Sequence, residues 1–133
     1  MNRTLATAES LAEKIRREYG TAVHTCALTD TNTLPAFLKR AEVAIQCTSL
    51  GLKPEDPPPF DPALLPGTIR VYDTIYKKTP IIRECLRRSI PCANGLAMLL
   101  HQGARSFEIW TRTKAPVERM RSALEAAYAK ASR

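Results

Sequence analysis

Short apolar runs alternate with amphipathic segments along most of the chain, and this alternation restricts the fold more than any other feature. The runs at residues 43–47 and 68–72 are rich in apolar and β-branched side chains, and segments with helical spacing lie between such runs. Strands that alternate with helices are joined by crossovers, so they run parallel within one sheet. The sequence therefore predicts an α/β fold, a doubly wound parallel sheet with helices on both faces.

Local signals give the boundaries of the expected elements. Helices are expected at residues 8–19, 33–40, 80–88 and 96–110, and from residue 116 onward, so two consecutive helices end the chain. Strands are expected at residues 21–28, 43–47, 68–72 and 89–93. Residues 48–66 are rich in Gly, Pro and Asp, which predicts a long loop because proline has no amide hydrogen to donate.

Length and composition indicate one ordered globular domain. The chain has 133 residues, and no segment approaches the roughly 20 consecutive apolar residues of a membrane span. No stretch near the N-terminus resembles a signal peptide, so the cytoplasm is the expected compartment and no membrane partner is expected. The four cysteines lack a Cys-x-x-Cys spacing, which favours free thiols over a metal site.

A formal net charge of +7 raises the question of nucleic-acid binding. The basic pairs lie on separate segments, and no aromatic residues are interleaved with them as stacking platforms. The distribution of charge therefore does not favour a nucleic-acid partner.

Polar residues and glycines follow three of the expected strands. Thr48 and Ser49 come after one, the segment 73–76 after the next, and Asn94-Gly95 after the last. In doubly wound sheets, ligands bind beyond the carboxyl ends of the strands, so these three groups would form one binding edge. The same residue types also favour turns for local backbone reasons, and the pattern alone leaves both interpretations open.

An ordered series of short motifs makes the interpretation more specific. In chain order they are Asn2-Arg3-Thr4, Thr48-Ser49-Leu50-Gly51, Val71-Tyr72-Asp73 with Tyr76, Thr79-Pro80, Asn94-Gly95-Leu96 with Met98-Leu99, His101-Gln102-Gly103, and Phe107-Glu108 with Trp110. This series resembles the shikimate dehydrogenase family, oxidoreductases of aromatic amino acid biosynthesis that use NADP. The resemblance implies a truncated, Rossmann-like NADP-binding domain over residues 1–110 and a C-terminal helix over residues 111–133.

The resemblance also assigns cofactor contacts. It implies that Asn2, Arg3 and Thr4 hold the adenosine 2'-phosphate, a role that suits the several donors of a guanidinium group. Thr7 stands where many relatives carry a second basic residue, which would weaken a preference for NADP over NAD. Thr48 and Ser49 are also implied to bind the cofactor, and Thr74, Gly95 and Met98 are implied to contact its nicotinamide end. For Met98, a place in the hydrophobic core is the alternative.

Substrate contacts are implied for Tyr76 and Gln102, whose phenol and amide can bind the hydroxyl and carboxylate groups of shikimate or 3-dehydroshikimate. A role as buried structural partners is the alternative for both residues. His101 is not expected to be catalytic, and Asp73 is expected to organise a turn. The resemblance places the catalytic lysine and aspartate of the family in an earlier domain, so no catalytic residue is expected in this chain.

Two parts of a complete dinucleotide-binding fold do not occur in the sequence. It contains no Gly-x-Gly-x-x-Gly motif, and the strand order 3-2-1-4-5-6 would leave two positions empty between residues 23–25 and 43–47. A missing N-terminal segment or a second copy of the chain is expected to fill them. The leading hypothesis is therefore that the chain is part of a dehydrogenase and that the chain is inactive by itself. The alternative is a non-catalytic remnant that acts in ligand sensing or assembly.

Overall fold

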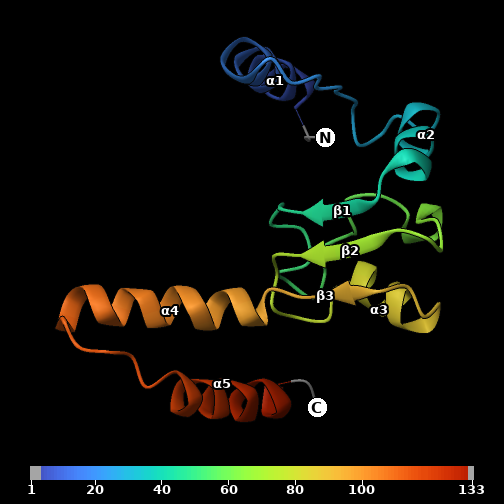
Figure 1. The fold of residues 1–133 in the computed structure, drawn as a ribbon. Coiled ribbons are helices and arrows are strands. Elements are labelled where there is room, and N and C mark those ends of the chain that lie inside the picture. The colour runs from blue at the N-terminus through green and yellow to red at the C-terminus, as the bar shows by residue number, and fades with distance from the viewer. Residues whose placement is uncertain (1–3, 132–133) are drawn as a thin grey trace.

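A three-stranded parallel sheet forms the centre of the protein (Figure 1). The structure, a computed structural model, describes residues 4–131. Strands β1 (Val43–Gln46), β2 (Arg70–Asp73) and β3 (Cys92–Ala93) lie side by side in that order, and Ala44, Val71 and Cys92 are level with one another across the sheet. The predicted α/β fold with a parallel sheet is confirmed.

Five α-helices accompany the strands in the described part of the chain. They are α1 (Leu5–Tyr19), α2 (Thr33–Arg40), α3 (Pro80–Arg87), α4 (Leu96–Thr111) and α5 (Val117–Ala131), and a short 3-10 helix η1 spans Pro62–Leu64. Helix α1 ends at Gly20, whose φ of 63° is left-handed and whose amide donates to the Arg16 carbonyl. The two consecutive helices expected at the end are α4 and α5, which pack as an antiparallel pair (Figure 1).

The hydrophobic core lies on one face of the sheet. Val71 of β2 points into it, together with Leu34 and Leu38 of α2 and Ile81 and Cys85 of α3. Leu64 and Leu65 of the long loop close the same cluster. Helices α2 and α3 and the loop therefore cover this face, and the loop is an integral part of the fold despite its prolines.

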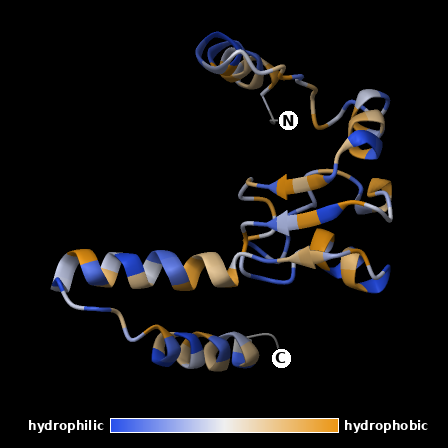
Figure 2. Cartoon of the chain, viewed as in Figure 1, coloured by the Kyte–Doolittle hydropathy of each residue, from blue (hydrophilic) through white to orange (hydrophobic). Residues whose placement is uncertain are grey.

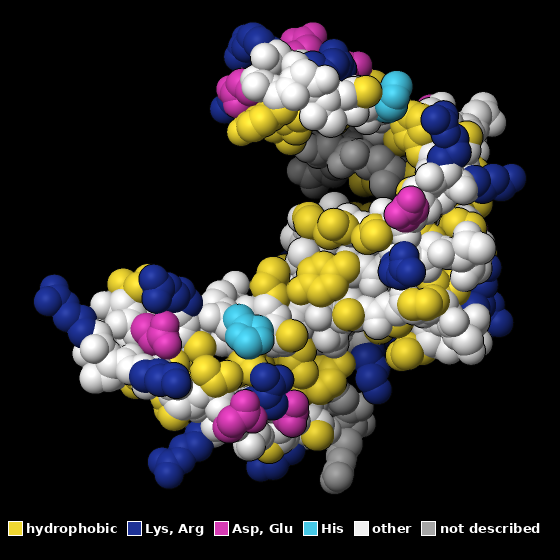
Figure 3. Space-filling view, viewed as in Figure 1, with side chains coloured by type: hydrophobic (Ala, Val, Ile, Leu, Met, Phe, Trp, Pro, Cys, Tyr) yellow, Lys and Arg dark blue, Asp and Glu magenta, His cyan; other side chains and the backbone are white. Residues whose placement is uncertain are grey.

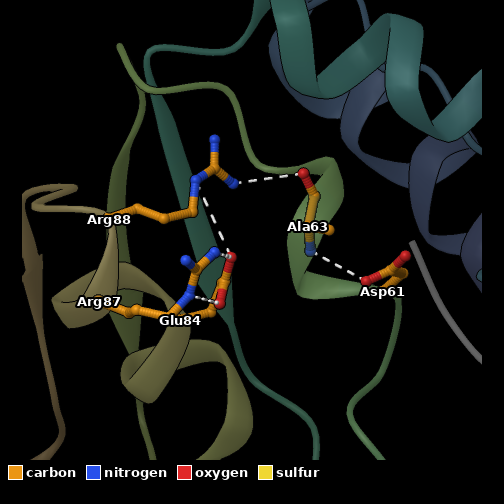
Figure 4. A network of polar contacts seen from close by, with 5 residues as sticks. All are labelled: Asp61, Ala63, Glu84, Arg87 and Arg88. Carbon is orange, nitrogen blue, oxygen red and sulfur yellow. Dashed lines mark hydrogen bonds and ion pairs between the residues drawn. The ribbon is translucent and has the colours of Figure 1, made fainter.

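Polar contacts hold the loop against α3 (Figure 4). The Asp61 carboxylate accepts from the Ala63 amide at 3.0 Å and so caps η1, while Arg88 donates to the Ala63 carbonyl at 3.3 Å. Glu84 pairs with Arg87 at 2.7 Å and with Arg88 at 3.9 Å, and these charged partners lower the pKa of the Glu84 carboxyl. The guanidinium of Arg88 thus links α3 to the loop.

The opposite face of the sheet and one of its edges are open. Side chains alternate along a strand, so Val43 and Ile45 point away from the core; they are 48% and 62% exposed. The Glu42 carbonyl accepts from Arg70 of β2 and the Gln46 carbonyl from Thr74 just after it. Val43 and Ile45 therefore direct their backbone groups to the outer edge of β1, where no described strand pairs. Apolar residues of β1 appear at this edge in Figure 2, and Figure 3 shows the hollow that separates it from α1.

The prediction of a strand over residues 21–28 is wrong. Within this stretch only Ala27 forms an isolated bridge, and residues 21–26 join no ladder. An alternating sequence becomes a strand only when a neighbour supplies hydrogen-bond partners, and β1 is the outermost strand on this side of the sheet. The segment instead packs beside α1, where Arg16 donates to the Val23 carbonyl at 3.3 Å.

Strand β3 is shorter than the predicted run of residues 89–93. Ser89 has a φ of 56°, and the Ile90 amide donates to the Cys85 carbonyl at 2.8 Å, so these two residues close α3. Pairing with β2 begins at the Pro91 carbonyl, which accepts from the Val71 amide at 2.9 Å.

Candidate functional site

The three loops that follow the strands are hydrogen-bonded to one another. The Thr74 amide donates to the Gln46 carbonyl at 3.0 Å, and the Gly95 amide donates to the Ile75 carbonyl at 3.1 Å. The Lys77 ammonium reaches back to the Leu52 carbonyl at 2.6 Å. The structure therefore brings the three polar groups together, and we refer to residues 48–52, 74–77 and 94–95 as the carboxyl rim.

Gly95 lies against the backbone of the neighbouring loop. A Cβ atom at this position would overlap the carbonyl oxygen of Thr74 and would lie 2.6 Å from its carbonyl carbon. Because a fixed backbone leaves no room for that atom, only glycine allows α4 to begin here. The close approach sets the distance between the loop after β2 and the first turn of α4.

The side chain of Gln46, which is 7% exposed, is hydrogen-bonded to the loop after β1. Its side-chain amide donates to the Leu50 carbonyl at 3.1 Å, and its side-chain oxygen accepts from the Thr48 amide. Gly51 has a φ of +109°, and a Cβ there would lie 2.8 Å from Thr79 Cγ2. The hydrogen bonds of Gln46 and the close contact of Gly51 with Thr79 thus fix the position of this loop.

Asp56 stabilises the far end of the same loop. Its carboxylate accepts from the amides of Lys53 at 3.0 Å and Gly51 at 3.1 Å. These backbone hydrogen bonds, that of Lys53 first, hold the pKa of the Asp56 carboxyl below its usual value.

Asp73, fully buried at the end of β2, organises the loop after it. Its carboxylate accepts from the Ile75 amide at 2.9 Å and from the Thr79 hydroxyl at 2.6 Å. Thr79 in turn caps α3 by accepting from the Ile82 amide at 3.3 Å. The expectation that Asp73 organises a turn is confirmed.

The other predicted cofactor residues lie on the carboxyl rim and the first turn of α4. Thr48 and Thr74 are half-buried and Ser49 is exposed. Met98 is 40% exposed and therefore does not lie in the hydrophobic core. Of the residues assigned to the 2'-phosphate, Asn2 and Arg3 lie outside the described residues, and Thr4 directly precedes α1.

The predicted substrate residues are accessible as well. Tyr76 is 38% exposed on the rim, and Gln102 is exposed on α4. Gln102 follows Met98 by four residues, so the two side chains lie on the same face of the helix. Neither Tyr76 nor Gln102 is a buried structural partner.

Sequence reasoning missed two residues that shape the rim, Gln46 and Lys77. A single polar residue in the apolar run 43–47 was a usable signal for Gln46, because a buried amide needs partners. For Lys77 the sequence offers no signal, since its partner Leu52 is 25 residues away.

Comparison with known proteins identifies the family. Residues 95–125, from the start of α4 into α5, match the model of the shikimate 5'-dehydrogenase C-terminal domain. The NADP(+)-dependent shikimate dehydrogenase of Symbiobacterium thermophilum is 37% identical over 131 residues, which cover 96% of this chain and 45% of that protein. The chain belongs to the shikimate dehydrogenase family.

Solved structures of shikimate dehydrogenases agree in fold. The enzyme of Listeria monocytogenes, in complex with shikimate and NAD, has a TM-score of 0.77 and 28% identity over 92% of this chain. The enzyme of Thermus thermophilus, in complex with NADP(H) and shikimate, has a TM-score of 0.68 and 28% identity over 95% of this chain. The chain covers 44% of each of these structures, so it corresponds to the C-terminal portion of a shikimate dehydrogenase.

Residues 4–131 contain neither a candidate metal site nor a candidate membrane-spanning helix. No group of three or more His, Cys, Asp or Glu side chains is placed to hold a metal ion there. None of the described helices combines the length and apolar character that crossing a membrane requires.

Proposed function

We propose that this chain is the NADP-binding and C-terminal portion of an enzyme that interconverts 3-dehydroshikimate and shikimate. The observation that carries the proposal is the close backbone contact between Gly95 and Thr74, because it fixes the loop after β2, which would face the cofactor, against the first turn of α4. Met98 and Gln102 follow on one accessible face of that helix, with Tyr76 exposed on the same rim. Rigid placement of binding groups is what a transfer between two bound molecules requires.

Each residue has a role in binding and orientation. Backbone groups of Thr74 and Gly95 and the Met98 side chain would hold the nicotinamide end of NADP, which accepts or returns a hydride when it is bound. Thr48 and Ser49 would contact the cofactor from the neighbouring loop. Tyr76 and Gln102 would orient shikimate through hydrogen bonds to its polar groups. The proton transfers are assigned to the portion of the enzyme that this chain does not match.

The open edge of β1 is where that portion would join. Val43 and Ile45 offer unpaired backbone groups in the described sheet and exposed apolar side chains, which together suit a further parallel strand. The proposed partner is the N-terminal portion of the same family of enzyme, in the same polypeptide or as a separate chain. The cytoplasm is the proposed compartment, and residues 1–110 and 111–133 remain the proposed division into cofactor domain and C-terminal helix.

A fusion tests this function. The N-terminal portion of the Symbiobacterium thermophilum enzyme that has no counterpart here is joined to Met1, and NADP+ reduction by shikimate is followed by absorbance. We expect shikimate-dependent turnover. A folded fusion that binds neither ligand would contradict the proposal and favour a non-catalytic remnant.

Arg3→Ala in this fusion should weaken NADP+ binding roughly tenfold or more, because a charge-assisted contact to the 2'-phosphate contributes about 1.5 to 3 kcal/mol. The affinity for NAD+, which lacks this phosphate, should change little. Arg17→Ala, a change of the same type in exposed α1, is the control. An equal loss for both cofactors would show that Arg3 serves folding.

Tyr76→Phe and Gln102→Ala should each raise the KM for shikimate about threefold to tenfold, since each removes one hydrogen bond to the substrate. The neighbouring exposed residue His101 supplies the control, and His101→Ala should leave both kcat and KM unchanged. Steady-state rates over a range of shikimate concentrations measure the effect. If both KM values stay at that of the parent fusion, the substrate assignment is wrong.

A further inference from the structure

The Asn94 side chain connects three segments that are distant in the sequence. Its amide nitrogen donates to the Tyr76 carbonyl at 2.8 Å and to the Tyr128 hydroxyl at 3.2 Å. Its side-chain oxygen accepts from the Leu96 amide at 3.3 Å, at the first residue of α4. One amide group therefore joins the loop after β2, the start of α4 and the last turns of α5.

Helix α5 is incompletely packed around this junction. A pocket of about 400 Å³ separates it from α3, with Ile82 and Leu86 on one wall and Leu124 on the other. Tyr128 and Asn94 both line the pocket, so their hydrogen bond bridges a region where side-chain packing is missing. In such a place one polar contact has a large share in setting the position of the helix relative to the rim.

We infer that Tyr128 and Asn94 are positioning residues, which act on substrate binding by holding the backbone of Tyr76. Neither side chain is assigned a contact with a ligand. The Asn94 amide nitrogen donates to two oxygens, so loss of the Tyr128 hydroxyl removes one of the two contacts that fix the amide and frees it to move. This inference rests on the proposed function for its kinetic test, but not for its structural test.

The kinetic test uses Tyr128→Phe and Asn94→Asp in the fusion. Tyr128→Phe keeps the ring and should raise the KM for shikimate roughly three- to tenfold, with kcat and the KM for NADP+ within about twofold of the parent. Asn94→Asp keeps the acceptor for the Leu96 amide but loses both donor hydrogens, so it should raise the KM for shikimate at least as much. Ser122→Ala, whose hydroxyl donates within α5, is the control and should change nothing.

The double variant distinguishes positioning from general destabilisation. If both residues act through one contact, adding Tyr128→Phe to Asn94→Asp should give no further rise in KM, whereas independent effects would multiply. A fall in kcat with KM unchanged, or multiplying effects, would overturn the inference.

The structural test does not depend on activity. Hydrogen exchange in the fusion should become at least about threefold faster at the Gly95 and Leu96 amides in Tyr128→Phe, and stay unchanged in β2. Unchanged exchange at both amides would overturn the inference even in an active enzyme. Faster exchange in a fusion without shikimate-dependent turnover would support the junction and reject the proposed function.

Discussion

Gly95→Ala is expected to lower kcat/KM of the fusion about 100-fold or more. The new Cβ would overlap the Thr74 carbonyl group, and a backbone cannot rotate away as a flexible side chain can. Either the loop after β2 or the first turn of α4 must therefore shift, and a displacement of about 1 Å in a binding site is enough for a loss of about 100-fold. Because Thr74, Tyr76 and Met98 lie on the two segments that move, both ligands should be affected.

The same substitution should also destabilise the fold by about 3 kcal/mol, at the upper end of what inserting one atom group into a packed site costs. Urea unfolding and initial rates measure the two effects. Gly67→Ala is the matched control, since a Cβ at that position has no atom within 4 Å. Wild-type rates in Gly95→Ala would show that the rim tolerates movement and would contradict its assigned rigidity.

The 133-residue chain by itself is expected to show no oxidation of shikimate and to be unstable as a monomer. An open β1 edge beside exposed Val43 and Ile45 favours pairing with another chain. We expect self-association, exchange of elements between copies, or order only when the N-terminal portion of a related enzyme is added. Light scattering after size-exclusion chromatography measures the mass at several concentrations.

A charged side chain on the open face provides a control for this expectation. Ile45→Lys should reduce association, because charged residues on exposed strands oppose edge pairing. Trp110→Lys, at an even more exposed apolar residue on α4, should not reduce it if the β1 edge is responsible. A compact monomer with a cooperative unfolding transition independent of concentration would show that the chain closes its own sheet.

Local signals were sufficient for most of the fold. The helix at residues 33–40 has the predicted boundaries, and the strands at residues 43–47 and 68–72 agree within about two residues. The run at residues 21–28 has an equally good strand pattern, but its partners are not in the described sheet. A strand depends on its neighbours, which a local pattern cannot reveal.

Part of the candidate site could likewise be predicted from the sequence, and part could not. The rule that ligands bind at the carboxyl ends of parallel strands was sufficient to group Thr48, Thr74 and Gly95. Contacts between distant segments were not foreseeable, such as that of Asn94 with Tyr128, 34 residues away. Likewise, no local pattern predicts that the Asn94 amide also donates to the Tyr76 carbonyl.

A crystal structure of the fusion with NADP+ and shikimate bound would locate both ligands relative to the carboxyl rim and so decide whether the rim is the binding site. We expect the nicotinamide to lie against the backbone of Thr74 and Gly95, with Met98 beside the ring. Shikimate should lie within hydrogen-bond distance of Tyr76 and Gln102. Binding of either ligand away from the rim, with these side chains free of contact, would show that the rim is not the site.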